Sequence, residues 1–155
     1  MKYHLDVMIK FDRYRLKELE ELKMREAKDI SVTTMDLNHI PYEVIGPVYF
    51  QVCNKGIFSS ALSKLAKQYR SEIEKMKKDG TISKERVDWG FLYGEWSVGQ
   101  SDFEKAFYIA TQELKKRAAM VGADAIIGLK EDVDLDTNEF QFFYMQMYGT
   151  AVKFK

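Results

Sequence analysis

The sequence contains a single cysteine, Cys53, so no disulfide can form within the chain. A lone cysteine suits a reducing compartment better than a secreted, disulfide-stabilised scaffold. The sequence also lacks an apolar run near the roughly 18 residues that a membrane-spanning helix needs, and its first residues lack the apolar stretch of a signal peptide. We therefore expect a cytoplasmic protein without a membrane span.

Net charge is absent as well, because 24 Lys and Arg residues balance 24 Asp and Glu residues. No overall field draws the chain to nucleic acid or to an anionic membrane, so nucleic acid is not an expected partner. Hydrophobic residues, in contrast, make up 46% of the 155 positions. This length and composition suit one compact domain and are short for two.

The first half of the chain predicts two helices and an extended segment between them. Residues 12–28 are rich in charge around a thin leucine stripe, which predicts an exposed helix. Residues 31–53 are rich in β-branched and aromatic residues and predict extended chain, which the pair Gly46-Pro47 interrupts as a bulge or a sheet edge. Apolar residues three and four apart predict a helix over about residues 59–78 that ends at Gly80.

The second half predicts another helix followed by strands. This helix is expected to begin at Ser101, because Ser101 and Glu104 have the spacing of a reciprocal capping box. Gly122 supplies a left-handed residue after the helix, and residues 125–129 then form a short apolar strand. Residues 131–136 alternate between acidic and apolar side chains, which predicts a strand with one wet face.

The closing strand, over residues 140–154, is expected to be apolar on both faces. Two helices can cover one face of a small sheet, so the other face needs a different cover, and a second copy of the chain is the simplest one. We expect a homo-oligomer in which the helices cover Phe143, Met145 and Met147. The residues expected to face the neighbouring subunit are aromatic: Phe140, Phe142, Tyr144 and Tyr148.

The segment 81–100 is unusual because it holds four aromatic residues among three glycines: Trp89, Phe91, Tyr93 and Trp96. These rings are expected to pack on the sheet or on a neighbouring subunit. A ligand pocket or a cage for a cation is the alternative.

Candidate metal ligands are few. A structural zinc site needs four Cys or His ligands that usually come in close pairs, and this chain has one cysteine and two histidines, His4 and His39. His39 and Cys53 remain candidates for a site shared between subunits, with buried packing as the alternative for Cys53.

Other chemical motifs are incomplete. The acidic residues Asp132, Asp134 and Asp136 resemble the start of a calcium loop, but the position that requires glycine holds Thr137. We interpret the three carboxylates as the solvent-facing row of an edge strand. The glycines do not have phosphate-loop spacing, and Cys53 with His39 lacks an identified orienting group. We therefore expect no enzyme and no bound cofactor.

Two stretches, KAFYIATQELKKRAAMVGADAIIG over residues 105–128 and GTAVK over residues 149–153, resemble the YbjQ family. This family comprises small bacterial proteins of unknown function that carry a heavy-metal-binding label. Thr33-Thr34, Ile40 and Gly46 before Val48 are similar to the family's opening strand. The resemblance covers about residues 32–155.

The resemblance implies an α+β subunit of β-α-α-β-β order, in which two helices cover a small, mainly antiparallel sheet. It further implies a ring-like homo-oligomer, with a pentamer favoured. Residues 1–31 have no counterpart in the short family members, so we interpret them as an N-terminal extension with a charged helix and residues 32–155 as the YbjQ-like domain.

Two function classes remain. The first is a non-enzymatic interaction or scaffold module that assembles with copies of itself. The second is the binding of a heavy metal or a small ligand at subunit interfaces. Metal retained after purification without added metal would favour the second class.

Overall fold

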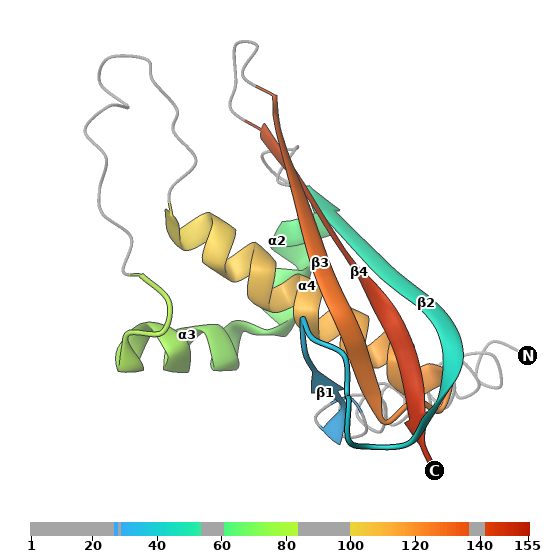
Figure 1. Cartoon of the computed structure of the whole chain (residues 1–155). Coiled ribbons are helices and arrows are strands. Elements are labelled where there is room, and N and C mark those ends of the chain that lie inside the picture. Colours follow the sequence, from blue (N-terminus) through green and yellow to red (C-terminus); the bar gives the residue numbers. More distant parts are fainter. Residues whose placement is uncertain (1–26, 28, 54–60, 84–99, 137–141) are drawn as a thin grey trace, which may run out of the picture.

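A computed structural model describes residues 27, 29–53, 61–83, 100–136 and 142–155 (Figure 1). The strands are β1 (Ser31–Val32), β2 (Tyr42–Cys53), β3 (Ala125–Asp136) and β4 (Phe142–Phe154), and the helices are α2 (Ala61–Gln68), α3 (Arg70–Asp79) and α4 (Gln100–Met120). The α+β class is therefore confirmed. Within the described ranges the sequence predicts two long helices and the structure has three, because one of the two is divided.

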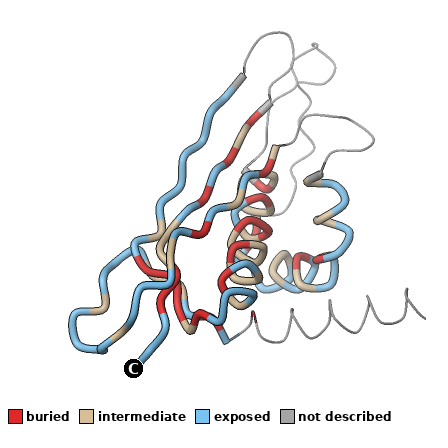
Figure 2. Tube along the Cα trace, turned by 90° about the vertical axis from the view of Figure 1, so that its right-hand side faces the viewer, coloured by how far each residue is buried: buried red, intermediate tan, exposed pale blue. Residues whose placement is uncertain are grey.

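The strands form one mixed sheet with the order β1-β3-β4-β2. Strand β1 runs parallel to β3, and the other neighbours are antiparallel. Figure 2 shows the three described helices on one side of this sheet, and we call that side the inner face and the opposite side the outer face. None of these helices combines the length and the apolar character that a bilayer-crossing helix requires.

Strand β2 is an edge strand with a bulge where the sequence predicted one. Its pairing with β4 shifts between Val44 and Gly46, directly before Pro47. Proline has no N–H to donate to a ladder, so an edge position next to a bulge accommodates it. The interpretation of Gly46-Pro47 as a bulge is confirmed; β2 lies at the sheet edge but pairs with β4 on both sides of this pair, so the strand does not change neighbours there.

A second bulge divides β3. The predicted apolar strand and the predicted alternating strand are one continuous strand, whose pairing with β4 shifts between Ile127 and Lys130. Gly128 lies in this shift with a φ of 59°, the left-handed region in which glycine is favoured. Gly149 of β4 passes close by, since an added Cβ there would lie 2.7 Å from Cγ2 of Ile126. The two glycines together allow β3 and β4 to approach at the bulge.

The helix expected over residues 59–78 is two helices that meet at Tyr69. Tyr69 has φ −96° and ψ 19°, outside the helical range, so α2 and α3 form separate segments. Gly80 adopts a φ of 83° after α3 and ends it as predicted. The helix is interrupted at Tyr69 because the ring of Tyr69 is buried in the core, where the residue is 2% exposed.

Helix α4 begins one residue before the predicted start and without the predicted capping box. Ser101 already lies inside the helix, and its hydroxyl is buried with no hydrogen-bond partner among the described residues. Glu104 accepts two hydrogen bonds from Ser83 instead of reaching back to Ser101. Gly122 has a φ of 72° after the helix, so the predicted exit is confirmed.

The main core lies between α4 and the inner face of the sheet. The helix contributes small side chains and one leucine, all fully buried: Ala106, Ala110, Leu114 and Ala118. They pack on Phe143, Met145 and Met147 of β4, so the helix-facing side of the closing strand is confirmed. The rings of Phe103 and Phe143 lie 4.8 Å apart at one end of this core.

The N-terminal boundary differs from the predicted one. Ala27 and Ile30 are 3% and 5% exposed, and Ile30 belongs to the main core. Strand β1 spans positions 31 and 32, and its Ser31 pairs with Ala125. A boundary between residues 31 and 32 would cut this strand, so the folded domain extends to at least Ala27. The rest of the charged helix predicted over residues 12–28 lies outside the described residues.

Candidate functional site

The two metal-ligand candidates lie at opposite ends of β2. His39 is exposed in the turn that precedes the strand, and Cys53 is its last residue and half-buried. A strand of 12 residues spans roughly 40 Å at about 3.3 Å per residue, so the two side chains cannot bind one ion within a subunit. Among the residues that the structure describes, no group of three or more Cys, His, Asp and Glu side chains could hold a metal ion.

Several predicted interface residues lie outside what the structure describes. They are Trp89, Phe91, Tyr93 and Trp96 of the aromatic segment and Phe140 before β4. The backbone of Phe142 pairs with Asp136, but the side chain of Phe142 is not described. The aromatic segment and Phe142 therefore stay predictions.

The remaining predicted interface residues, Tyr144 and Tyr148, lie on the outer face together with a tyrosine that sequence reasoning missed. Tyr148 pairs with Tyr49 of β2, and these side chains are 38% and 68% exposed. Tyr144 is half-buried opposite Cys53, and between these pairs Gln51 lies opposite Gln146. We call these six residues the tyrosine face.

Within the described chain, other residues pack on the outer face at the end of the sheet that holds Ala125 and Val152. There the turn before β2 packs Leu37 and Tyr42 on a small buried cluster of Ala125, Ile127 and Val152. The hydroxyl of Tyr42 donates to the carboxylate of Asp36 at 2.6 Å, which fixes the turn. The described segments leave Tyr49 and Tyr148 of the tyrosine face exposed.

Carboxylates of β3 border the tyrosine face. Asp132 and Asp134 pair with Gln146 and Tyr144, and both are exposed, as the predicted wet row requires. The negative charge of Asp132 raises the pKa of Tyr148, and desolvation and a hydrogen bond to Asp132 add to this shift. The raised pKa of Tyr148 means that the neighbouring carboxylate favours the neutral phenol.

An arginine of α4 holds the edge strand beside this face. Arg117 donates a hydrogen bond to the backbone carbonyl of Tyr49. Its guanidinium also lies 5.3 Å from the ring centroid of Tyr49 and 5.0 Å from that of Phe50. These contacts hold the backbone of Tyr49 and place a positive charge beside its ring. The helical pattern gave no signal for them, because Arg117 lies on the polar side of α4.

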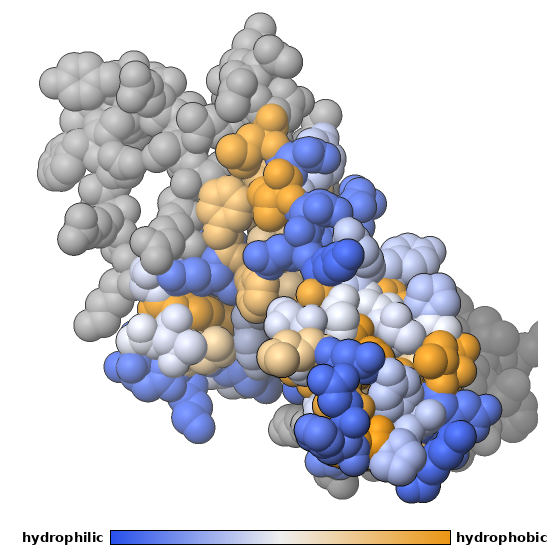
Figure 3. All heavy atoms as spheres, viewed as in Figure 1, coloured by the Kyte–Doolittle hydropathy of each residue, from blue (hydrophilic) through white to orange (hydrophobic). Residues whose placement is uncertain are grey.

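A second candidate site is a groove on the inner face, with a volume of about 510 Å³. It lies where α4 covers β2 and β4 more fully than β3. Figure 3 shows apolar residues gathered between α4 and the upper end of β3. The groove is lined by Met76, Thr81, Ile82, Phe103, Glu104, Phe107, Tyr108, Thr111, Glu131, Val133 and Met145.

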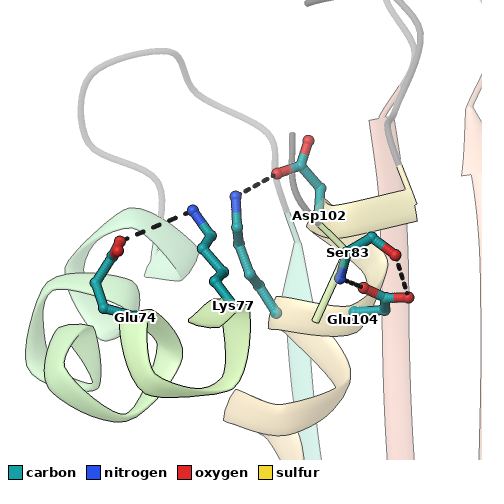
Figure 4. A network of polar contacts seen from close by, with 6 residues as sticks. Glu74, Lys77, Ser83, Asp102 and Glu104 are labelled. Atoms are coloured by element: carbon teal, nitrogen blue, oxygen red, sulfur yellow. Dashed lines mark hydrogen bonds and ion pairs between the residues drawn. The ribbon is translucent and has the colours of Figure 1, made fainter. Parts of the chain in front are cut away.

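A polar network stands beside this groove, where the end of α3 meets the start of α4 (Figure 4). The carboxylate of Glu104 accepts hydrogen bonds from the backbone N–H of Ser83 at 2.5 Å and from its hydroxyl at 2.9 Å. Lys105 lies 3.4 Å from Asp102. These contacts fix the chain after Ile82 against α4 and so hold one end of the groove in shape.

Comparison with known proteins finds a family similarity over part of the chain. No curated protein matches the sequence. A solved structure that aligns with the chain is a protein of unknown function of the DUF74 family from Pediococcus pentosaceus ATCC 25745. The two share 20% identity with a TM-score of 0.48, and the alignment covers 81% of this chain and 98% of the other. Residues 91–155 match the YbjQ family, whose description is "Putative heavy-metal-binding", and over these residues the resemblance is confirmed.

Proposed function

We propose that the protein is a non-enzymatic interaction module that assembles with copies of itself through the tyrosine face. The exposed pair Tyr49 and Tyr148 carries this proposal, because two large rings lie side by side on the half of the outer face that no described segment covers. The family resemblance favours five subunits. A ring of this kind would act as a scaffold.

The chemistry of the tyrosine face suits an interface that is partly wet. Tyrosine is enriched at protein interfaces because it combines a large apolar ring with a hydroxyl that keeps a polar partner. Tyr148 already has such a partner in Asp132. Arg117 restrains Tyr49 before any partner arrives, so little side-chain entropy is lost on association.

The assembly is tested by light scattering on the purified chain and on Tyr148→Asp. The wild type should form a particle of several subunits at micromolar concentration. The variant should dissociate with unchanged secondary structure, because it places a second carboxylate beside Asp132 in the centre of the face. Met120→Asp is the matched control, since Met120 is 64% exposed at the end of α4, away from the sheet. A monomeric wild type, or equal dissociation by both variants, would contradict the proposal.

A second candidate function is metal binding at subunit boundaries, which the family description favours. The chain would contribute His39 or Cys53 from each subunit, since the two side chains cannot meet within one. Plasma mass spectrometry of the native protein after mild chelation tests this function. We expect no tightly held zinc, because the chain lacks paired Cys and His ligands. One metal per subunit that is lost in His39→Ala or Cys53→Ala would establish the shared site instead.

A further inference from the structure

The groove on the inner face exposes aromatic and apolar surface at positions where the patterns of α4 and β3 predict burial. Phe107 lies on the core-facing side of α4 yet is 42% exposed. Val133 lies on the helix-facing side of β3 and is also 42% exposed. Both line the groove, and Met145 lies buried at its floor. The exposed ring of Phe107 and the exposed side chain of Val133 therefore border the same groove.

The charged residues that line the groove are all of one sign. Among the described lining residues the ionisable acidic groups are Glu104 and Glu131, and none is a lysine, arginine or histidine. Glu104 is held in place by its two hydrogen bonds from Ser83. Glu131 is exposed on the same face of β3 as Val133, opposite Met147. An apolar hollow with two carboxylates at its margin is complementary to a molecule that is apolar and positively charged.

We propose that this groove binds a small organic cation with an apolar body, such as a lipophilic amine. The body would lie between Phe107 and Val133 over Met145, and the ammonium group would lie toward Glu131. Phe103, Phe107 and Tyr108 also line the groove, and aromatic rings attract a positive charge. A volume of about 510 Å³ suits one small molecule and is small for a folded partner. The site is separate from the tyrosine face and does not depend on assembly.

Three probes with one body and different charge test this proposal: 4-phenylbutylamine, 4-phenylbutanol and 4-phenylbutanoate. The methyl signals of Met76 and Met145 in an NMR titration report on the groove, because both line it. Met120, exposed at the end of α4, serves as the internal control. Probes of this size should bind with a dissociation constant of about 1 mM. We expect the amine to bind about threefold tighter than the alcohol at low salt, and the butanoate to bind weakest.

Two variants with a matched control locate the charge. Glu131→Gln keeps the shape of the groove and should remove the advantage of the amine over the alcohol. Asp134→Asn makes the same charge change three residues on, but on the outer face, and should leave that advantage intact. Phe107→Ala should weaken amine and alcohol alike, since it removes the apolar wall that both share.

Several results would overturn the proposal. They are equal or tighter binding of the butanoate, loss of the amine's advantage in Asp134→Asn, and no shift of the Met76 and Met145 methyl signals with any probe up to about 10 mM. Shifts of these signals that follow protein concentration without a probe would assign the groove to a second copy of the chain. Each of these results leaves the proposed assembly through the tyrosine face standing, so the two proposals fail separately.

Discussion

Removal of the N-terminal segment should have an effect that depends sharply on where the cut is made. A chain that begins at Ala27 keeps Ile30, which is 5% exposed in the main core, and keeps β1. A chain that begins at Val32 loses Ile30 and Ser31. The two chains differ by residues 27–31, which include the buried Ala27, and the difference between the truncations therefore measures how far this segment stabilises the domain.

The magnitude follows from burial and hydrogen bonding. Loss of a buried isoleucine side chain costs about 2–4 kcal/mol of the free energy of unfolding. Ser31 donates a backbone hydrogen bond to Asp124 at 3.3 Å, and its loss adds about 1 kcal/mol. The sum, about 3–5 kcal/mol, is a large share of the roughly 5–15 kcal/mol that stabilises a typical domain. At about 2–4 °C per kcal/mol, the midpoint of the chain beginning at Val32 should lie about 6–20 °C below that of the chain beginning at Ala27.

Thermal unfolding followed by circular dichroism provides the assay, with two point variants in the full chain as controls. Ile30→Ala should reproduce most of the loss, whereas Ile40→Ala should change the midpoint little, since Ile40 is 46% exposed in the turn before β2. Equal midpoints for the two truncations would show that Ile30 does not stabilise the core and would restore the boundary at residue 32.

Two further predictions concern single side chains. Gly149→Ala should lower the free energy of unfolding by about 1–3 kcal/mol in urea denaturation, because the new Cβ would lie 2.7 Å from Cγ2 of Ile126. An unchanged urea midpoint would mean that β3 moves aside freely. Burial and a hydrogen bond to Glu113 raise the pKa of Tyr69, so the folded state favours the neutral phenol and its stabilising effect should be lost as pH rises above about 10. Tyr69→Phe should be less sensitive than the wild type to this rise in pH, and a parallel decline of the two would refute the assignment.

The sequence predicted the elements whose signals are local. Gly80 and Gly122 ended helices as expected, because a left-handed residue needs only its own backbone. The faces of β4 were also predicted, since alternation along one strand places Phe143 and Met147 together whatever the neighbours are.

The features that the sequence did not predict depend on contacts between distant segments. The division of the first long helix at Tyr69 follows from a ring anchored by Glu113, 44 positions away. The capping box does not form because Glu104 accepts a hydrogen bond from Ser83 instead, and the residues around Ser101 gave no sign of this distant partner. Tyr49 was missed as a site residue because only strand pairing brings it beside Tyr148.

The bulge at Gly128 decides which way the second half of β3 faces. If the same residues alternated strictly from Ile126 with no bulge, Asp132 and Asp134 would face the helices and Val133 would face the opposite side of the sheet. The bulge inverts this order, so Asp132 faces outward beside the tyrosine face and Val133 lines the groove. This one bulge therefore decides which side chains of β3 lie at each of the two candidate surfaces. Deletion of the one extra residue at this position would therefore leave Asp132 and Val133 on their present faces, whereas the full-length strand paired without a bulge would exchange them.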